Sequence, residues 1–333
     1  MSKVSVLVAV YNAEKYLSTC LDSLINQTLK DIQIICIDDA STDSSDAILQ
    51  SYARKDARIN VLRMEKNSGQ AKARNHGLEI AEGEFTTMLD SDDWMSEDAL
   101  EKAYDQFLKS TDVDVVLFDL LLWENGRITS SYQRNERDRI LSGKKAFELS
   151  LDWKLHGLYM VRTDLHRRFL YDTSCKLYSD DNTTRLHFLY ARNVGFCNGV
   201  YYYRQHQESA THAIDLHRFD YLDANLNMKK MLMQEKVEKA YIDYYEQHRW
   251  VNLVGIYGFY KKYKCSFDVS ERNMIKERFK YILSTIEPER LGRHLKCKFG
   301  YIPFKSFFLF CLEENCYFFL RKMKELIRDI PHS

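Results

Sequence analysis

Residues 86–94, with the sequence TTMLDSDDW, place the carboxylates Asp90, Asp92 and Asp93 at the end of an apolar run. Each carboxylate disfavours ionisation of its neighbours, so either the turn is fully solvated or a cation binds there. In extended backbone, residues i and i+2 point to the same side, so Asp90 and Asp92 can face one ion while Asp93 points away. Two carboxylates with open remaining positions suit Mg²⁺ or Mn²⁺, with a substrate diphosphate as a further ligand.

A D-x-D pattern alone is weak evidence, because so short a motif also arises by chance. The sequence contains a second one, Asp112-Val113-Asp114, which precedes an apolar run instead of following one. We therefore expect the second pair at the opposite edge of any parallel sheet. A structural alternative for residues 90–93 is an acidic turn that caps the following helix.

The elements that must position these residues alternate between β-branched runs and helical periodicity from residue 4 to about residue 120. This pattern predicts an α/β layer structure with a parallel sheet. The predicted strands cover residues 4–10, 32–37, 59–64, 85–89 and 113–122. An apolar stripe predicts a core-facing helix between the first two strands, and Ser41 and Ser96 are expected helix N-caps.

Polar clusters follow the ends of three of these strands, at Tyr11-Asn12, Asp38-Asp39 and residues 90–93. In open parallel α/β sheets ligands bind outside the carboxyl ends of the strands, so the three clusters predict one site. For Asp38 and Asp39 the structural alternative is a turn and helix-cap cluster. The glycine fingerprint of a dinucleotide oxidoreductase is missing after the first strand, which argues against that class.

Composition sets broader limits. Lys plus Arg and Asp plus Glu both number 48, so no global positive charge indicates a nucleic-acid partner. The eight cysteines include no C-x-x-C pair, which is typical of reduced thiols. The apolar run near the N-terminus is too short for a secretory signal, and no window is long enough for a membrane span. We expect a cytoplasmic protein.

The chain is expected to divide near residue 215. Residues 1–215 would form the first domain, which carries the predicted site and has parts of about 1–112 and 113–215. Residues 216–333 have helical sequence without recognisable chemistry. Their last part combines many Phe residues with basic ones, which suits peripheral contact with an anionic membrane surface, whereas a homodimer interface or ordinary core packing are the alternatives. The basic residues are Lys296, Lys298, Lys305, Arg321, Lys322 and Lys324.

Four segments together resemble the N-terminal half of family 2 glycosyltransferases of the bacterial surface-polysaccharide type. They are VSVLVAVYNAEKYLSTCLDSLINQT, CIDDASTDSS, NSGQAKARNHGLEIAEGE and TTMLDSDD, in this order and spacing. The resemblance covers residues 4–95 closely and continues more weakly to about 212. It implies a GT-A fold, which is a Rossmann-like sandwich, followed here by the C-terminal helical extension. It also implies inverting transfer from a nucleotide-diphosphate sugar with Mn²⁺ or Mg²⁺. Residues 1–215 would then be the catalytic domain, with nucleotide-sugar binding in about 1–112 and the acceptor and catalytic part in about 113–215.

The resemblance also implies site residues. The family's usual Pro-x-Tyr-Asn reads Ala9-Val10-Tyr11-Asn12, and the change to Ala9 removes a rigid turn but no contacting side chain. Asp90 and Asp92 match the metal ligands. The implied donor contacts are Ala9, Tyr11, Asn12, Asp38, Asp39, Gly69, Arg74, Asp90 and Ser91. A glycine before a helix also exposes backbone N–H groups suited to an anion, whereas Arg74 could alternatively be a solvated helix residue.

A catalytic base is implied in the segment KLYSDDNTTRLHF, where Asp181 is the first choice and Asp180 the second. The alternative is that both acids only stabilise a helix N-terminus. The segment VYYYRQHQESAT resembles the part that closes over the diphosphate, with Arg204 and His206 as contacts, although an aromatic edge strand is the plain alternative. Trp153 and His156 lie where acceptors usually bind.

The sequence therefore predicts a metal-dependent inverting glycosyltransferase, of hexosyltransferase type, that uses a UDP-sugar. Its acceptor would be a glycan or a lipid-linked saccharide at the inner face of the cell membrane. Transfer to polyprenyl phosphate is one alternative, since that acceptor is already ionised and needs no base. A nucleotide-sugar-binding protein without turnover is the other.

Overall fold

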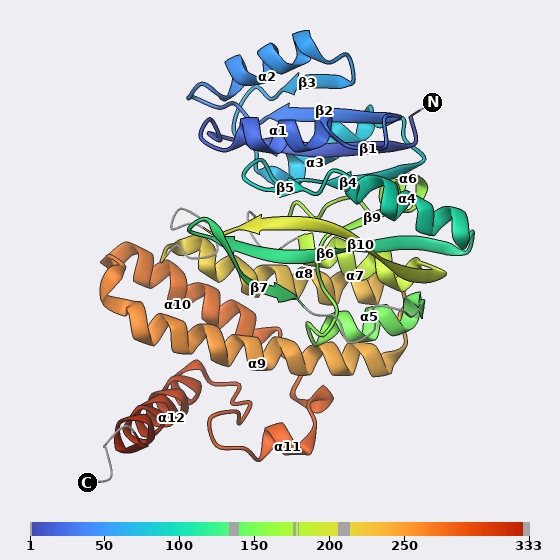
Figure 1. Ribbon diagram of the computed structural model, residues 1–333. Coiled ribbons are helices and arrows are strands. Elements are labelled where there is room, and N and C mark those ends of the chain that lie inside the picture. The colour runs from blue at the N-terminus through green and yellow to red at the C-terminus, as the bar shows by residue number, and fades with distance from the viewer. Residues whose placement is uncertain (1, 133–139, 176–177, 179, 206–213, 329–333) are drawn as a thin grey trace. The chain divides into compact units, whose positions relative to one another are not determined.

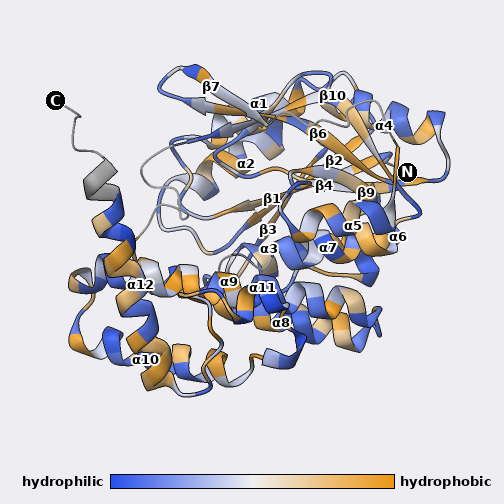
Figure 2. Cartoon of the chain, turned by 90° about the horizontal axis from the view of Figure 1, so that it is seen from below, coloured by the Kyte–Doolittle hydropathy of each residue, from blue (hydrophilic) through white to orange (hydrophobic). Residues whose placement is uncertain are grey.

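The computed structural model describes residues 2–132, 140–175, 178, 180–205 and 214–328 (Figure 1). His206, a predicted diphosphate contact, lies outside these residues. The chain divides into two compact units, Met1–Ser209 and Ala210–Ser333. In both, the helices carry hydrophobic residues beside hydrophilic ones, as amphipathic helices packed on a core do (Figure 2).

The N-terminal unit is built on a sheet of ten strands in the order β3-β2-β1-β4-β9-β6-β10-β5, with β7 beside β6 and β8 beside β10 (Figure 1). The strands are β1 Val4–Val10, β2 Ile32–Asp38, β3 Ile59–Arg63, β4 Phe85–Met88, β5 Trp94–Met95, β6 Val113–Glu124, β7 Arg127–Tyr132, β8 Leu141–Ser142, β9 Tyr159–Arg162 and β10 Asn193–Arg204. The helices of this unit are α1 Leu17–Ile25, α2 Ser45–Lys55, α3 Gln70–Glu79, α4 Ala99–Lys109, α5 Gly143–Leu151, α6 Thr163–Arg168 and α7 Asp180–Tyr190.

The longest strands share one direction. β1 pairs in parallel with β2 and β4, β2 with β3, and β6 with β10. The short strand β9 runs antiparallel to both β4 and β6, so β4 and β6 have the same direction. The carboxyl ends of β1, β2, β4, β6 and β10 therefore meet at one edge of the sheet. The predicted α/β fold with a mainly parallel central sheet is confirmed.

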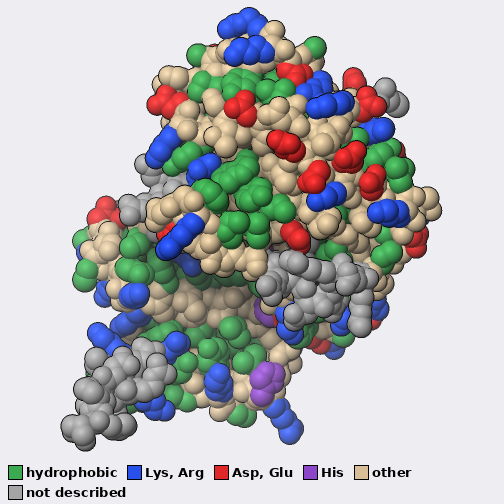
Figure 3. All heavy atoms as spheres, viewed as in Figure 1, with side chains coloured by type: hydrophobic (Ala, Val, Ile, Leu, Met, Phe, Trp, Pro, Cys, Tyr) green, Lys and Arg blue, Asp and Glu red, His purple; other side chains and the backbone are tan. Residues whose placement is uncertain are grey.

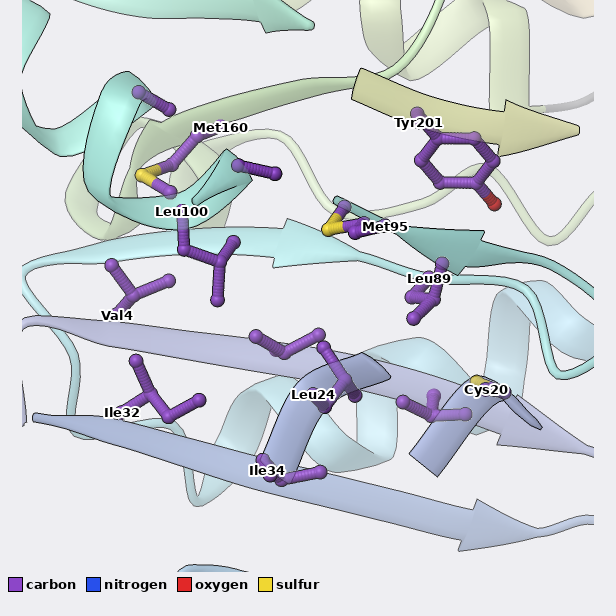
Figure 4. Packing of buried hydrophobic residues seen from close by; sticks show 14 of the residues in the cluster. Val4, Cys20, Leu24, Ile32, Ile34, Leu89, Met95, Leu100, Met160 and Tyr201 are labelled. Carbon is purple, nitrogen blue, oxygen red and sulfur yellow. The ribbon is translucent and has the colours of Figure 1, made fainter. Parts of the chain in front are cut away.

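Side chains of β1 alternate between two cores, which makes the sheet the middle layer of a sandwich. Val4, Val6 and Val8 face a core that includes α1 and α4, while Leu7 faces a second core with α3. Figure 4 shows part of the first of these cores, to which α1 contributes Leu24 and α4 contributes Leu100. The predicted stripe of α1 is buried there at Leu17, Cys20, Leu21 and Leu24.

Two expected N-caps are wrong. α2 begins at Ser45, after Ser44, and α4 begins at Ala99, after Asp98. The hydroxyl of Ser41 instead accepts a hydrogen bond of 3.0 Å from the backbone N–H of Asn12, and that of Ser96 accepts one of 3.1 Å from the backbone N–H of Val200. Both hydroxyls are thus used between segments and not at helix ends.

The C-terminal unit contains only helical elements among its described residues: η2 Leu216–Phe219, α8 Asp220–Gln234, α9 Lys239–Tyr263, η3 Lys264–Ser266, α10 Val269–Ser284, η4 Pro288–Arg290, α11 Arg293–Lys296 and α12 Phe307–Arg328. Its core is rich in aromatic rings, with Phe219, Trp250, Phe279 and Phe310 almost fully buried. None of the helices in the described part of the chain is both long and apolar enough to cross a membrane.

Candidate active site

The ends of β1 and β2 are joined at the carboxyl edge of the sheet. Val10 is in register with Asp38, and the backbone N–H of Asp39 donates a hydrogen bond of 2.8 Å to the carbonyl of Val10. Asn12 has a φ of 49° and accepts a hydrogen bond of 2.8 Å from the N–H of Thr42. The preceding Tyr11 is 48% exposed, so its ring is available to a ligand at this edge.

The two acids after β2 have different partners. Asp38 is fully buried, accepts a hydrogen bond of 3.0 Å from the N–H of Ser41 and lies 3.5 Å from Arg63. Asp39 accepts hydrogen bonds of 2.8 and 2.7 Å from the N–H groups of Ser68 and Gly69. Asp39 therefore holds the loop that leads into α3.

Gly69 forms the N-terminal boundary of α3 with a φ of 87°, a conformation that side chains disfavour. A cavity of about 320 Å³ lies beside this helix start. It is lined by residues 67–69 and Lys72 on one side and by residues 173–175 on the other. The cavity is large enough for part of a small-molecule ligand, and Asp39 of the second polar cluster binds Ser68 and Gly69 in its wall.

The acidic turn after β4 separates its three carboxylates by environment. Asp93 is 1% exposed and accepts hydrogen bonds from the Tyr201 hydroxyl, at 2.9 Å, and from the backbone N–H of Arg204, at 2.7 Å. Asp90 and Asp92 are only partly buried. The side chain of Asp93 is thus occupied within the protein, while the other two carboxylates border solvent.

Asp90 forms an ion pair with Arg74 of α3 through one carboxylate oxygen, Oδ1. Arg74 is 1% exposed, so it is not a solvated helix residue, and its Nε and Nη1 atoms have no hydrogen-bond partner among the described residues. Burial raises the pKa of Asp90, and the negative charges of Asp92 and Asp180 raise it further despite the pairing with Arg74. Negative charge is thus only partly balanced at this turn, which favours a cation there.

Arg204, at the end of β10, packs onto the same turn. Its Nε donates a hydrogen bond of 2.8 Å to the backbone carbonyl of Asp92, and its guanidinium lies 4.6 Å from the ring centre of Trp94 and 4.8 Å from that of Tyr16. The aromatic rings hold the cation by cation–π attraction beside the carboxylates. The structure therefore places Arg204 at the acidic turn, and its contact with a diphosphate stays a prediction.

Asp180 and Asp181 form the first turn of α7. Asp180 acts electrostatically on both Arg74 and Asp90, so this helix end faces the acidic turn. Burial raises the pKa of Asp181 to about 7, with a further increase from Asp180 and an opposing effect from Arg185. A carboxyl with a pKa raised to about 7 has the protonation equilibrium that a general base near neutral pH requires.

The predicted acceptor residues lie close to this helix. The guanidinium of Arg185 is 5.9 Å from the ring centre of Trp153, which is 41% exposed. The ring of His156 lies 5.4 Å from that of Trp153. Trp153 and His156 thus form an aromatic edge next to the residue that interacts with Asp181.

The second D-x-D pattern, Asp112 to Asp114, lies at the amino end of its strand, as expected, and its side chains bind other side chains of the protein. Asp114 contacts Arg192 at 2.6 Å and Arg162 at 3.0 Å, and Asp112 accepts a hydrogen bond of 2.7 Å from Asn193. Both acids lie at the start of β6, opposite the carboxyl edge.

Several residues that shape the site were not singled out from the sequence. Tyr201 supports Asp93, Tyr16 and Trp94 hold Arg204, and Tyr171 places its ring 5.4 Å from the guanidinium of Arg74. Aromatic residues are common in cores, so their types gave no signal. In a strand, side chains two residues apart lie on the same face of the sheet, so the segment VYYYR indicates which residues share a face with Tyr201 but not which residue its hydroxyl binds.

The sequence model for Glycosyl transferase family 2 matches residues 5–173, which is just over half of the chain. The chain belongs to glycosyl transferase family 2. This confirms the predicted family, and with it the predicted class of enzyme, a glycosyltransferase. The matched range includes the three polar clusters and Arg74, whereas Asp180, Asp181 and Arg204 lie beyond it.

Relatives of this family 2 chain match it over different lengths. The putative glycosyltransferase EpsH of Bacillus subtilis is 35% identical over 218 residues, which are 62% of this chain and 62% of EpsH. The minor teichoic acid biosynthesis protein GgaA of Bacillus subtilis is 27% identical over 330 residues, 93% of this chain and 72% of GgaA. The similarity to GgaA thus includes the C-terminal helices.

The structure of residues 1–349 of S. aureus TarS in complex with UDP-GlcNAc superposes with a TM-score of 0.72 at 22% identity. It covers 95% of this chain and 91% of that one. At this identity the likeness concerns the fold, and it confirms the predicted GT-A type sandwich with a helical C-terminal extension.

Proposed function

We propose that this protein is an inverting, metal-dependent glycosyltransferase that moves a hexosyl group from a UDP-sugar to a hydroxyl of a surface glycan or lipid-linked saccharide. One observation carries the proposal. Asp180 interacts electrostatically with both Arg74 and Asp90. The first turn of α7 and the acidic turn after β4 therefore lie near each other at the carboxyl edge. A donor diphosphate at the turn and an acceptor near α7 would meet there.

The acidic turn fits a hard divalent cation. Oδ1 of Asp90 is paired with Arg74, and the side chains of Asp90 and Asp92 are only partly buried. Carboxylate oxygens suit Mg²⁺ or Mn²⁺, which commonly bind one or two carboxylates plus substrate phosphates. Asp90 and Asp92 would be the protein ligands of this ion. When bound, the ion stabilises the departing diphosphate as a Lewis acid.

The remaining steps are assigned to this chain's own groups. Base and ribose of the donor would be held by residues at the ends of β1 and β2 and at the start of α3, namely Ala9, Tyr11, Asn12, Asp38, Asp39 and Gly69. Arg204 lies beside the turn and would neutralise diphosphate charge, with Ser91 as a further donor contact. Asp181 takes the proton of the acceptor hydroxyl while the hydroxyl oxygen attacks the anomeric carbon of the donor sugar. The bond between this carbon and the diphosphate breaks in the same step. Trp153 and His156 would orient the acceptor.

The nature of the substrates is supported by the relatives. TarS binds UDP-GlcNAc within the same fold, which supports a UDP-sugar donor. GgaA takes part in minor teichoic acid synthesis and matches almost the full chain, which supports a cell-surface polymer as acceptor.

Turnover assays test the proposal. UDP release would be measured with Mn²⁺ and acceptor extract for the wild type, Asp92→Asn and Asp181→Asn. Loss of turnover in both variants is expected, while Asp112→Asn at the opposite edge should keep the wild-type rate. Normal turnover of Asp181→Asn would instead indicate an acceptor that is already ionised, such as polyprenyl phosphate. UDP should also raise the melting temperature more than GDP or CMP does.

A peripheral membrane contact is proposed for α12. Its side chains Phe308, Leu312, Phe319 and Met323 follow the helical period on one face, and Phe308 is 73% and Phe319 64% exposed. The opposite face packs Phe310 into the core. Figure 3 shows Lys and Arg side chains near the chain end as well. An exposed apolar face flanked by the cations Lys322 and Lys324 suits an anionic membrane surface.

Sedimentation with phosphatidylglycerol vesicles tests this contact. The double variant Phe308→Ser/Phe319→Ser should bind less than the wild type. The control Val269→Ser/Met274→Ser removes similarly exposed apolar side chains from α10 and should bind normally. Equal binding by all three proteins would contradict the proposal, and loss of a concentration-dependent dimer in the α12 variant would assign the face to a second copy.

A further inference from the structure

The C-terminal unit contains a small basic pocket between α9, α10 and the start of α12. It has a volume of about 120 Å³. Three exposed lysines lie along it: Lys261 at the end of α9, Lys264 in η3 and Lys276 in α10. None of the three forms an ion pair with another described residue, and the lining contains no acidic residue. Three unbalanced positive charges thus surround one small space.

The inner wall of the pocket is aromatic and contains an unpartnered hydroxyl. Tyr260 is 4% exposed, and its hydroxyl has no hydrogen-bond partner among the described residues. The neighbouring Tyr257 hydroxyl lies 3.3 Å from Asn315, so its needs are met within the unit. A buried hydroxyl without a partner is costly, and a ligand in the pocket could supply the missing hydrogen bond after a small side-chain shift.

The carboxyl of Glu314 lies behind this wall and acts electrostatically on Tyr257 and Cys311. Burial, with a further contribution from Glu313, raises the pKa of Glu314 to about 8. At neutral pH this carboxyl is therefore mostly uncharged and does not oppose an anion in the pocket.

The volume limits the size of the ligand. Sites for drug-sized ligands usually measure about 300–1,000 Å³, so this pocket admits a small group but no nucleotide or sugar ring. A phosphate group combines small size, one or two negative charges and several acceptor oxygens, which match three ammonium groups and a hydroxyl donor. Figure 3 shows Lys and Arg side chains gathered with hydrophobic ones over α10.

We infer that the pocket bordered by Lys261, Lys264 and Lys276, with Tyr260 in its wall, binds the phosphate group of a phosphodiester. The site lies outside the catalytic unit, and the inference does not rest on the proposed transfer reaction. Two sources share this chemistry: a phosphodiester-linked polymer and a phospholipid headgroup. The position of the pocket on α12 supports the lipid source. Phe307 and Cys311 line the pocket, and the residues next to them in the sequence, Phe308 and Leu312, belong to the exposed apolar face of α12.

The experiment measures binding by the full chain and needs no turnover. One arm titrates inorganic phosphate and glycerophosphoglycerol, a soluble phosphodiester, by calorimetry at constant ionic strength. The other compares sedimentation with phosphatidylglycerol and with phosphatidylcholine vesicles. The test variant is Lys261→Gln/Lys276→Gln, and the control Lys239→Gln/Lys262→Gln removes the same charge from α9 outside the pocket.

We expect the test variant to bind about tenfold more weakly than the control, a difference of about 1.4 kcal/mol, because two of the three ammonium groups that would meet the phosphate are removed. Weaker binding of the soluble phosphates alone assigns the pocket to a polymer, and weaker binding of phosphatidylglycerol vesicles alone assigns it to a lipid. Equal affinity of test variant and control, or no binding by the wild type in either arm, would overturn the inference.

Tyr260→Phe separates ligand binding from a structural role. The hydroxyl has no partner within the described chain, so its removal should leave the melting temperature without phosphate unchanged or slightly higher. Phosphate binding should weaken several-fold. A lower melting temperature with unchanged phosphate affinity would assign the hydroxyl to the fold and contradict its part in the site.

Discussion

The hydroxyl of Tyr201 donates a hydrogen bond of 2.9 Å to the carboxylate of Asp93, which lies 108 residues earlier in the chain. The same hydroxyl accepts a hydrogen bond of 3.1 Å from the backbone N–H of Asp90. A single buried side chain of β10 thus holds both ends of the turn that presents Asp90 and Asp92.

Tyr201→Phe should therefore loosen the acidic turn while keeping the packed ring. We expect a loss of about 1–3 kcal/mol in unfolding free energy, because Asp93 loses a buried donor and the N–H of Asp90 an acceptor. Donor affinity should fall as well. Tyr202→Phe is the matched control, since this neighbouring ring stacks on Trp94 through its face. Similar urea midpoints for Tyr201→Phe and the wild type would contradict this role.

Asp92 and Asp93 are adjacent but should respond differently to alanine. Asp93→Ala leaves the Tyr201 hydroxyl and the N–H of Arg204 without their acceptor, so we expect a melting temperature lower by several degrees. Asp92→Ala removes a partly exposed side chain and should change stability by less than about 1 kcal/mol while abolishing metal-dependent turnover. Calorimetry and UDP release on both variants measure the two effects. Equal destabilisation of the two would refute this division of roles.

The proposed base predicts a pH profile. A carboxylate accepts a proton only when it is ionised, and the pKa of Asp181 is about 7. The value of kcat/KM should therefore rise about tenfold per pH unit below 7 and level off above it. Asp181→Asn should lose about 10²–10⁴-fold in rate and show no inflection near pH 7.

Asp180→Asn distinguishes the two acids. It removes a negative charge that raises the pKa of Asp181, so the inflection should move to lower pH while activity persists. Complete loss of activity in Asp180→Asn together with an unchanged profile in Asp181→Asn would make Asp180 the base.

Glu314 predicts a pH-dependent stability of the C-terminal unit. The pKa of this fully buried carboxyl is raised from 4.5 to about 8. A raised carboxyl pKa means that the folded state binds the proton more tightly, so the contribution to stability is complete below pH 4.5 and is lost as pH rises through 8. Between these values the loss is about 1.4 kcal/mol per pH unit.

Glu314→Gln cannot ionise, so its melting temperature should fall less between pH 6 and 9 than that of the wild type. Glu289→Gln, an exposed position in the same unit, should follow the wild-type curve. Parallel curves for all three proteins would show that Glu314 ionises without cost.

The sequence was sufficient for the strands that build the carboxyl edge. The predicted strand at residues 4–10 coincides with β1, and the end of β2 lies one residue beyond the prediction, at Asp38. These strands are buried β-branched runs, whose pattern is strong and local. The same pattern placed Asp112 and Asp114 at the opposite edge, where they bind arginine and asparagine side chains.

Features that depend on distant partners could not be predicted. β9 has four residues, too few for a periodic pattern, yet it lies between β4 and β6 and joins these two strands into one sheet. Ser96 looks like an N-cap, but its hydroxyl binds the N–H of Val200, 104 residues away. The lysines of the basic pocket come from separate helical elements and form no motif in the sequence.

The bond between Tyr201 and Asp93 also bears on biosynthesis. The ribosome makes the acidic turn early, but the side chain that holds it belongs to one of the last strands of the catalytic unit. A nascent chain that lacks β10 would expose the turn without its support and without Arg204. Binding of the proposed sugar-nucleotide donor should consequently appear late during translation, so that truncated chains would not sequester it.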